Sequence, residues 1–384
     1  MNITTDHIIF VTALSLAIVI VIGIVCYLIL LRKKREEGDA PVSHKIKRHH
    51  ANPIMSPRPH QEWETNGTFN PTAIEDDEGR VHLLYRAIGN NGLSNIGHAS
   101  SIDGMNFDRR SPFPVYQPHV EEKNPSEKKS SGPAQYNPAI YTSGGGWGGH
   151  EDPRAVKIGS RVYMTYTAFQ GWGSVRIGLT SIAVKDLKKE RWNWKKPRLI
   201  SPPDEVHKNW VLFPEKVNGK YAILHGIVPK IMIEYVDDLD ETFPHIKSSR
   251  PQGPQPGREG FWDNILRGAG PPPIKTNRGW LLLYHAVDRK EFHKYKLGAM
   301  ILDANDPTRI LYRAPEPILT PDMCYENDGK PGIVYASGAI VRDGQLLVYY
   351  GGGDRHVCIA QTPLDVLLDW LVTYGKHTGQ ENVV

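Results

Sequence analysis

The residues best suited to chemistry lie in the run His150-Glu151-Asp152-Pro153-Arg154, which follows a glycine-rich stretch at 144–149. Adjacent carboxylates beside an arginine suit general acid–base catalysis. The glycines allow a ligand to approach the backbone closely, and Trp147 offers a face on which a sugar ring could stack. Because side chains alternate along a strand, only one of Glu151 and Asp152 can point into a site. The plainer alternative is an ordinary Asp–Arg ion pair at a strand start.

The elements that must position this run are short strands that recur along the chain. A turn built on glycine precedes each of five apolar strands that end in an aromatic residue or histidine, at 81–85, 162–166, 221–225, 280–284 and 346–350. Another short strand precedes each turn, at 70–74, 152–156, 213–217, 272–274 and 337–341. Five copies of one hairpin predict an all-β fold, a five-bladed β-propeller whose inner strands line a central channel. The run Pro363 to Tyr374 has helical spacing and predicts a helix outside the blades.

The N-terminal part of the chain predicts a membrane anchor. Residues 8–31 contain no charged side chain and are numerous enough to span about 30 Å of hydrocarbon as a helix. The basic run Arg32-Lys33-Lys34-Arg35 follows at once, so the positive-inside rule places the rest of the chain in the cytoplasm. We therefore expect a short tail at 1–7, a transmembrane helix at 8–31 in contact with the lipid bilayer, a basic juxtamembrane linker at 32–60 and a propeller domain at 61–384.

Charge and cysteine content exclude several classes of function. The net charge is +4, but residues 32–60 hold eight Lys and Arg against three acidic residues, which with the single negative charge of Asp6 leaves residues 61–384 neutral. A neutral domain lacks the basic footprint of a nucleic-acid-binding protein. Cys26, Cys324 and Cys358 show neither disulfide nor zinc-site spacing, so we expect no metal. The oligomeric state stays open.

A set of short motifs, in this order, resembles glycoside hydrolase family 130, the β-mannoside phosphorylases and related β-mannosidases. They extend over about Asn52 to Ala360 and are Asn70-Pro71, Tyr85-Arg86-Ala87, Ile96-Gly97-His98-Ala99-Ser100, Glu151-Asp152-Pro153-Arg154, Phe213-Pro214-Glu215-Lys216, Gly268-Ala269-Gly270-Pro271-Pro272-Pro273-Ile274, Tyr284-His285, and Tyr349-Tyr350-Gly351 before Asp354. The resemblance implies a five-bladed propeller that cleaves β-mannosides with inversion.

The resemblance also implies a role for each matching residue. Asp152 matches the catalytic acid that protonates the leaving oxygen, and such an acid needs a raised pKa, which the neighbouring carboxylate Glu151 could provide. Substrate contacts are expected from Asn70, Arg86, Glu151, Arg154, Tyr295 and Asp354. If inorganic phosphate is the attacking co-substrate, Lys216, His225 and His285 are expected to bind it. No other cofactor is expected.

The sequence departs from the phosphorylase pattern at two places. His225 is followed by Gly226 and Ile227, where family phosphorylases continue with Arg-Pro, and Leu266 stands where they carry a lysine, with Arg267 beside it. A buried phosphate needs its charge matched, so these departures favour attack by water. The base would then be Glu234 or Glu326.

Several plainer alternatives stay open. Arg86 and Lys216 could form surface ion pairs, and His225 and His285 could be core histidines. A propeller that binds carbohydrate without cleaving it, or one that serves as a protein scaffold, would explain the repeat as well.

Overall fold

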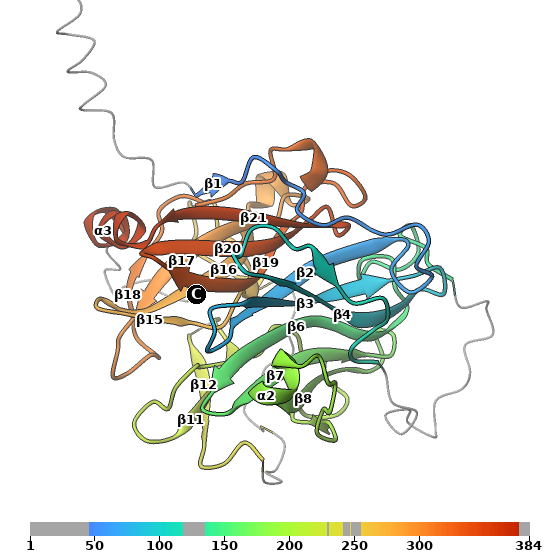
Figure 1. Cartoon of the computed structure of the whole chain (residues 1–384). Helices are drawn as coiled ribbons and strands as arrows, with labels where there is room; N and C mark the ends of the chain where they lie inside the picture. The colour runs from blue at the N-terminus through green and yellow to red at the C-terminus, as the bar shows by residue number, and fades with distance from the viewer. Residues whose placement is uncertain (1–45, 118–134, 229, 241–245, 247–254, 376–384) are drawn as a thin grey trace, which may run out of the picture. The chain divides into compact units, whose positions relative to one another are not determined.

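The computed structural model of the chain describes residues 46–117, 135–228, 230–240, 246 and 255–375, and its secondary structure is mostly β-strand (Figure 1). All five predicted hairpins are present as antiparallel strand pairs, but the first strand of the third lies at 211–212 instead of 213–217, and that of the fourth at 274–276 instead of 272–274. The pairs are β2 (Gly67–Glu75) with β3 (Val81–Ile88), β6 (Gly148–Ile158) with β7 (Arg161–Phe169), β10 (Val211–Leu212) with β11 (Tyr221–Gly226), β15 (Ile274–Thr276) with β16 (Gly279–Val287), and β19 (Val334–Arg342) with β20 (Gln345–Gly352).

A further antiparallel strand extends each pair. These strands are β4 (Leu93–Ser101), β8 (Val175–Ala183), β12 (Met232–Val236), β17 (Lys296–Leu302) and β21 (His356–Pro363). The remaining strands are β1 (Lys47–Arg48), β5 (Arg109–Arg110), β9 (Arg198–Leu199), β13 (Gln255–Pro256), β14 (Ile265–Ala269) and β18 (Ile310–Arg313). The helical elements are α2 (Val184–Lys188), α3 (Leu364–Tyr374) and the 3₁₀ turns η2 (Arg289–Glu291) and η3 (Cys324–Glu326).

The prediction of a five-bladed β-propeller is wrong. Hydrogen bonding groups the described strands into four sheets of eight, six, four and three strands, and none of these sheets closes on itself. The eight-stranded sheet arises because β4 pairs in parallel with β6 through Leu93–Gly148 and Ser94–Gly149, which joins the first two hairpins. The structure is a mostly-β fold of several open sheets.

The prediction of a transmembrane helix and of a single-pass membrane location is corrected as well. Among the described residues no helix is long and apolar enough to cross a bilayer. The longest one described, α3, has 11 residues, whereas a span needs about 20. The predicted span at 8–31 lies outside the described residues.

The predicted linker at 32–60 also differs from the structure in its second half. β1 pairs with β21 at the edge of the four-stranded sheet, and the side chain of Asn52 exchanges hydrogen bonds with the backbone of Ile359. Residues from Ile46 onward are therefore part of the fold.

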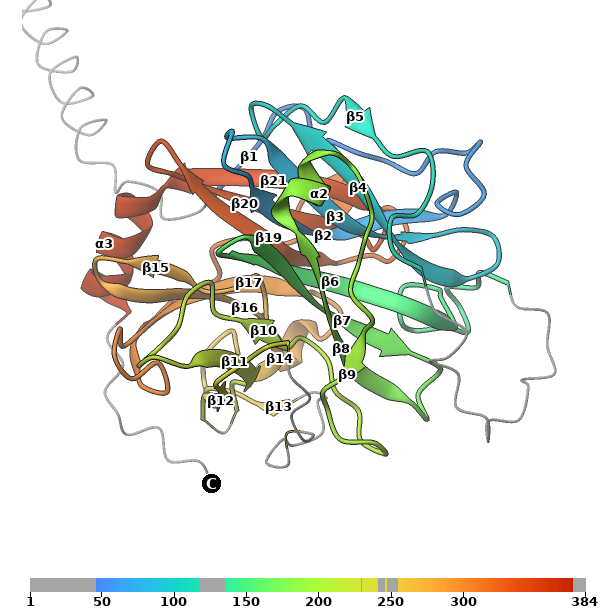
Figure 2. The same ribbon diagram turned by 60° about the horizontal axis from the view of Figure 1, so that its bottom comes forward.

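The strands that position the site are β2, β6 and β19, which lie side by side (Figure 2). Gly338 in β19 permits this approach, because a Cβ atom there would come within 2.7 Å of the Pro71 carbonyl oxygen. The predicted C-terminal helix is confirmed as α3, whose Leu367, Leu368 and Leu371 are buried in the apolar cluster beneath β17, β20 and β21.

Candidate active site

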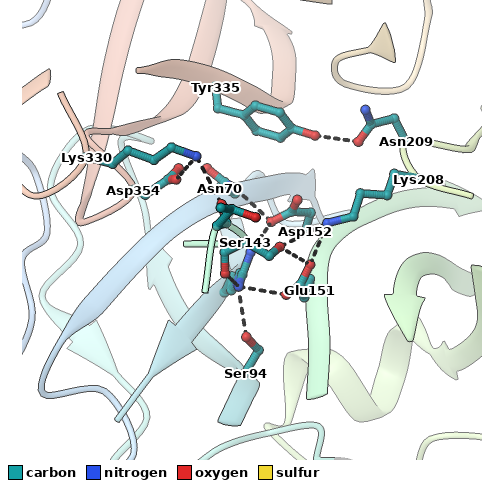
Figure 3. Close-up of polar contacts among 12 residues, drawn as sticks. Asn70, Ser94, Ser143, Glu151, Asp152, Lys208, Asn209, Lys330, Tyr335 and Asp354 are labelled. Carbon is teal, nitrogen blue, oxygen red and sulfur yellow. Dashed lines mark hydrogen bonds and ion pairs between the residues drawn. The ribbon is translucent and has the colours of Figure 1, made fainter. Parts of the chain in front are cut away.

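The candidate site begins at two interruptions of the strand pairing. The register of β2 with β3 shifts between Phe69 and Thr72, and that of β6 with β7 shifts between Glu151 and Arg154. At these bulges Asn70 and Asp152 have φ of 49° and 50°, a left-handed conformation that Asn and Asp tolerate better than most residues. A bulge re-aims its side chain. Here both side chains turn into one cavity, where Asn70 Nδ2 donates to Asp152 Oδ1 at 2.8 Å (Figure 3).

The cavity has a volume of about 280 Å³, and charged and polar side chains are numerous among the residues that line it. Gly351 lets the wall close, because a Cβ atom there would lie 2.1 Å from Asn70 Oδ1. The lining residues are Asn70, Arg86, Thr142, Ser143, Gly144, Asp152, Trp172, Val206, Lys208, Asn209, Arg267, Tyr295, Lys330, Ile333, Tyr335 and Asp354. Four of the predicted residues, Asn70, Arg86, Tyr295 and Asp354, therefore meet the predicted acid Asp152 in one cavity.

The surroundings of Asp152 favour its carboxylate form. Burial acts to raise its pKa, but the charges of Arg86, Lys208 and Arg154, with the hydrogen bond from Asn70, outweigh burial and lower the pKa below its usual value. Arg86 Nη1 lies 3.4 Å from Asp152 Oδ1. The raised pKa that the sequence predicts for a general acid is therefore not found at Asp152.

Glu151 does not line the cavity, although the sequence predicted a substrate contact. Its side chain is fully buried behind Asp152, which agrees with the expectation that only one of the two carboxylates faces the site. Glu151 accepts hydrogen bonds from Arg86 Nη2 at 2.8 Å, from Ser143 Oγ at 2.8 Å and from Lys208 Nζ at 2.9 Å (Figure 3).

Four cationic side chains line the cavity, and three of them are paired with carboxylates. Arg86 and Lys208 pair with Glu151, and Lys330 Nζ lies 3.5 Å from Asp354 (Figure 3). Arg267 differs, because among the described residues it has no carboxylate partner. Its guanidinium donates to the Tyr295 hydroxyl and lies 4.7 Å from the centroid of that ring. Burial lowers the pKa of Arg267, which is the expected effect of an unmatched charge removed from water.

Arg154 lies beneath the cavity wall, and no atom of it lines the cavity. Its guanidinium donates to the Gly270 carbonyl at 2.9 Å, to Asn209 Oδ1 at 3.0 Å and to the Tyr335 hydroxyl at 2.9 Å. Arg154 thus positions Asn209 and Tyr335, which do line the cavity.

The three residues that the sequence predicted to bind phosphate lie away from the cavity. Lys216 is exposed before the β10–β11 turn, with its ammonium 4.5 Å from the centroid of the Tyr221 ring. His225 is buried beside Trp210, and burial lowers its pKa to about 4. His285 is buried, accepts a hydrogen bond from the Ala336 N–H at 2.9 Å, and has a pKa lowered by burial to about 3.

Neither carboxylate predicted as the base for water lines the cavity. Glu234 lies in β12, opposite Ile223, and is partly exposed. Glu326 is fully buried and accepts hydrogen bonds from Arg48 Nε at 2.7 Å and from the Tyr350 hydroxyl at 2.8 Å. These contacts give Glu326 a structural role.

Lys208, Asn209, Lys330 and Tyr335 line the cavity but were not predicted from the sequence. Lys208 and Asn209 directly precede the apolar run Trp210 to Phe213, and this position at a strand start is the signal that could have identified them. Lys330 lies in a glycine-containing loop outside the hairpin pattern, which carries no comparable signal.

The comparisons with known proteins agree with the motifs. Residues 132–373 match the model of a glycoside hydrolase 130 family, described as beta-1,4-mannooligosaccharide phosphorylase. The chain is 35% identical to the 1,2-beta-oligomannan phosphorylase of Thermoanaerobacter sp. (strain X514), over 82% of this chain and 96% of the relative. It is 34% identical to the beta-1,2-mannobiose phosphorylase of the same organism, over 80% and 94% of the two chains.

A solved structure supports the same assignment. The beta-1,2-mannobiose phosphorylase from Listeria innocua, in complex with beta-1,2-mannobiose, superposes with a TM-score of 0.64 at 25% identity, over 85% of this chain and 99% of that one. The resemblance drawn from the motifs is confirmed, and with it the expectation of a glycoside-cleaving enzyme of the β-mannoside class. The chain belongs to glycoside hydrolase family 130.

Proposed function

We propose that this enzyme cleaves β-mannosides by phosphorolysis with inversion. In this reaction the bond between the mannose C1 and the glycosidic oxygen breaks and a bond forms from C1 to a phosphate oxygen. Asp152 donates the proton that the leaving oxygen takes up, and the products are α-mannose 1-phosphate and the shortened saccharide. Relatives over 30% identical carry phosphorylase names, which supports phosphate over water as the attacking group.

The unpaired guanidinium of Arg267 carries the proposal. A charged group removed from water without a partner is unfavourable, and it becomes favourable when an anion binds. Arg267 lies over the Tyr295 ring and donates only one hydrogen bond to it, so the rest of its planar fork is available for a phosphate. The departure from the family pattern at Leu266 therefore leaves a cation in the cavity, one position further along.

Lys208 is a second cation that lines the cavity. Two of its three N–H groups contact Glu151 and Ser143, at 2.9 and 3.0 Å, and the third is available to an anion. Two positive charges would compensate the negative charge of a phosphate bound between Lys208 and Arg267. This arrangement offsets the missing arginine after His225, on which the prediction of hydrolysis rested.

Phosphate binding would also prepare Asp152 for its role. The charge of Lys208 is among the causes that hold the pKa of Asp152 low. A bound dianion beside Lys208 opposes that charge and favours the protonated carboxyl. The acid is therefore expected to form in the complex with phosphate, which reconciles the pKa that the protein's own groups give Asp152 with proton donation.

The cavity offers little support for water as the attacking group. Inverting hydrolysis needs a second carboxylate that activates water. Among the described residues, the carboxylates that line the cavity are Asp152 and Asp354, and Asp354 is paired with Lys330.

Product analysis of the full chain tests the proposal. The substrates are β-1,2- and β-1,4-linked mannosides, incubated with and without inorganic phosphate. Mannose 1-phosphate that appears only with phosphate is the expected product. Free mannose released at a phosphate-independent rate would refute phosphorolysis, and no product from any substrate would favour a carbohydrate-binding role.

A further inference from the structure

Glu151 is a fully buried carboxylate that touches the site's cations without touching the cavity. Its Oε1 accepts from Arg86 Nη2 at 2.8 Å, and its Oε2 accepts from Lys208 Nζ at 2.9 Å and from Ser143 Oγ at 2.8 Å. Three hydrogen bonds thus hold both oxygens, and because the side chain is fully buried and does not line the cavity, it is out of reach of a sugar hydroxyl.

The two cations are held closer to Glu151 than to Asp152. Arg86 reaches Glu151 at 2.8 Å but Asp152 only at 3.4 Å. Lys208 is bonded to Glu151 and Ser143, and no ion pair between Lys208 and Asp152 is formed among the described residues. If Glu151 lost its charge, Asp152 would be the remaining carboxylate in the described part of the chain within ion-pair distance of Arg86, and the charge of Lys208 already acts on it.

None of the other groups that face Asp152 can hold Arg86 and Lys208 in place of Glu151. Arg154 adds positive charge, and Asn70 on β2 donates a hydrogen bond to the carboxylate. His285 on β16 and Tyr335 on β19 are neutral near pH 7, because burial lowers the pKa of His285 to about 3 and raises that of Tyr335 to about 12. Asp354 is already paired with Lys330.

We propose that Glu151 is a positioning residue that binds Arg86 and Lys208 more closely than Asp152 does, so that Asp152 can take up its catalytic proton and Lys208 stays in place to contact phosphate. The part of this inference that concerns phosphate rests on the proposed function. The part that concerns Asp152 does not, because the leaving oxygen needs a proton whether phosphate or water attacks.

The test is Glu151→Gln in the full chain, which removes the charge and keeps the shape. With both cations drawn to Asp152, its carboxylate is stabilised, so the pH above which kcat falls should drop by about one unit. Lys208 is drawn away from phosphate, so the KM for phosphate should rise about tenfold. Glu151→Asp retains the charge but has a shorter side chain. It should therefore raise the KM for phosphate and shift the pH above which kcat falls much less. If Glu151→Gln does not fold, Glu151→Asp still tests the proposal through the KM for phosphate.

A matched control is available at Glu64, another fully buried carboxylate. It accepts from Arg110 Nη2 at 2.8 Å and from the Tyr85 hydroxyl at 3.0 Å, and it does not line the cavity. Glu64→Gln should lower the melting temperature and leave both the pH limb and the KM for phosphate unchanged.

The outcomes separate this inference from the proposed function. If the wild type is a phosphorylase and the pH limb of Glu151→Gln stays in place, or moves as it does in Glu64→Gln, Glu151 is merely structural and the inference is overturned. If the wild type instead cleaves mannosides without phosphate, the proposed function is wrong. The pH above which the rate of hydrolysis falls, compared between the wild type and Glu151→Gln, then still decides whether Glu151 acts on Asp152.

Discussion

Replacing Arg267 by methionine should separate phosphate binding from stability. A hydrogen bond to a charged group contributes about 1.5–3 kcal/mol, so loss of one such bond to phosphate should lower kcat/KM for phosphate by roughly 10- to 150-fold. The free energy of unfolding should change little. The variant gives up the hydrogen bond to Tyr295 and a cation–π contact, each worth about 1 kcal/mol, but it also removes a charge that has no carboxylate partner.

The assay records initial rates of mannose 1-phosphate formation against phosphate concentration, together with thermal unfolding of the same samples. Arg267→Lys should recover part of the loss, because it restores the charge but not the planar fork. Arg258→Met is the matched control. Arg258 also lies over an aromatic ring, that of Phe261, but it is paired with the buried Asp263 at 2.9 Å.

Breaking the Arg258–Asp263 pair should destabilise the protein by about 3 kcal/mol and leave the KM for phosphate unchanged. An unchanged KM for phosphate in Arg267→Met would refute the assignment of Arg267 as the unpaired phosphate ligand. A melting temperature that falls as far in Arg267→Met as in Arg258→Met would show instead that Arg267 is part of the structural framework.

Four further predictions follow from the contacts of single residues. Asp152→Asn should lower kcat by about 10²- to 10⁴-fold on mannobiose and much less on a nitrophenyl β-mannoside, whose leaving group needs no proton. The pKa of Asp152 lies below its usual value, so its stabilising effect is present above about pH 4 and is lost as the pH falls through the folded-state pKa. Melting temperatures from about pH 5 to 3 should therefore fall less steeply in Asp152→Asn than in the wild type. His285→Phe removes the acceptor of the Ala336 N–H and should cost about 1–3 kcal/mol in unfolding experiments with no change in KM for phosphate; a raised KM would restore His285 as a phosphate ligand. Glu326→Gln should lower stability and leave the turnover of folded enzyme intact, and loss of turnover at unchanged stability would mark Glu326 as a base.

The sequence predicts the strands of this fold better than their grouping into sheets. Each hairpin depends on alternation and a glycine turn within about 20 residues, and all five are present, although the first strands of the third and fourth begin about two residues away from the predicted positions. The pairing of Leu93 with Gly148 joins two hairpins across more than 50 residues, and no local pattern encodes it. For the same reason the sequence could not show that Lys47 and Arg48 pair with β21.

The candidate site shows the same division between local and non-local information. Asn70, Arg86, Asp152, Tyr295 and Asp354 were identified through short motifs, and they meet in the cavity. Lys208 and Lys216 show where the prediction of the cavity's lysine failed. They lie eight residues apart, on opposite sides of β10. The motif pointed to Lys216, whereas the direction of the strand places Lys208 in the cavity and Lys216 at the outer turn.

The chemistry of this fold is concentrated where its regular backbone is broken. Eight described non-glycine residues have a positive φ, and four of them line the cavity: Asn70, Asp152, Asn209 and Asp354. Such conformations cost about 1–3 kcal/mol each and persist where surrounding contacts fix them. The bond from Asn70 to Asp152 and the bond from Arg154 to Asn209 provide such contacts. In a regular strand, side chains alternate between the two faces of the sheet. The bulges at Asn70 and Asp152 instead let residues from two separate hairpins converge on one substrate.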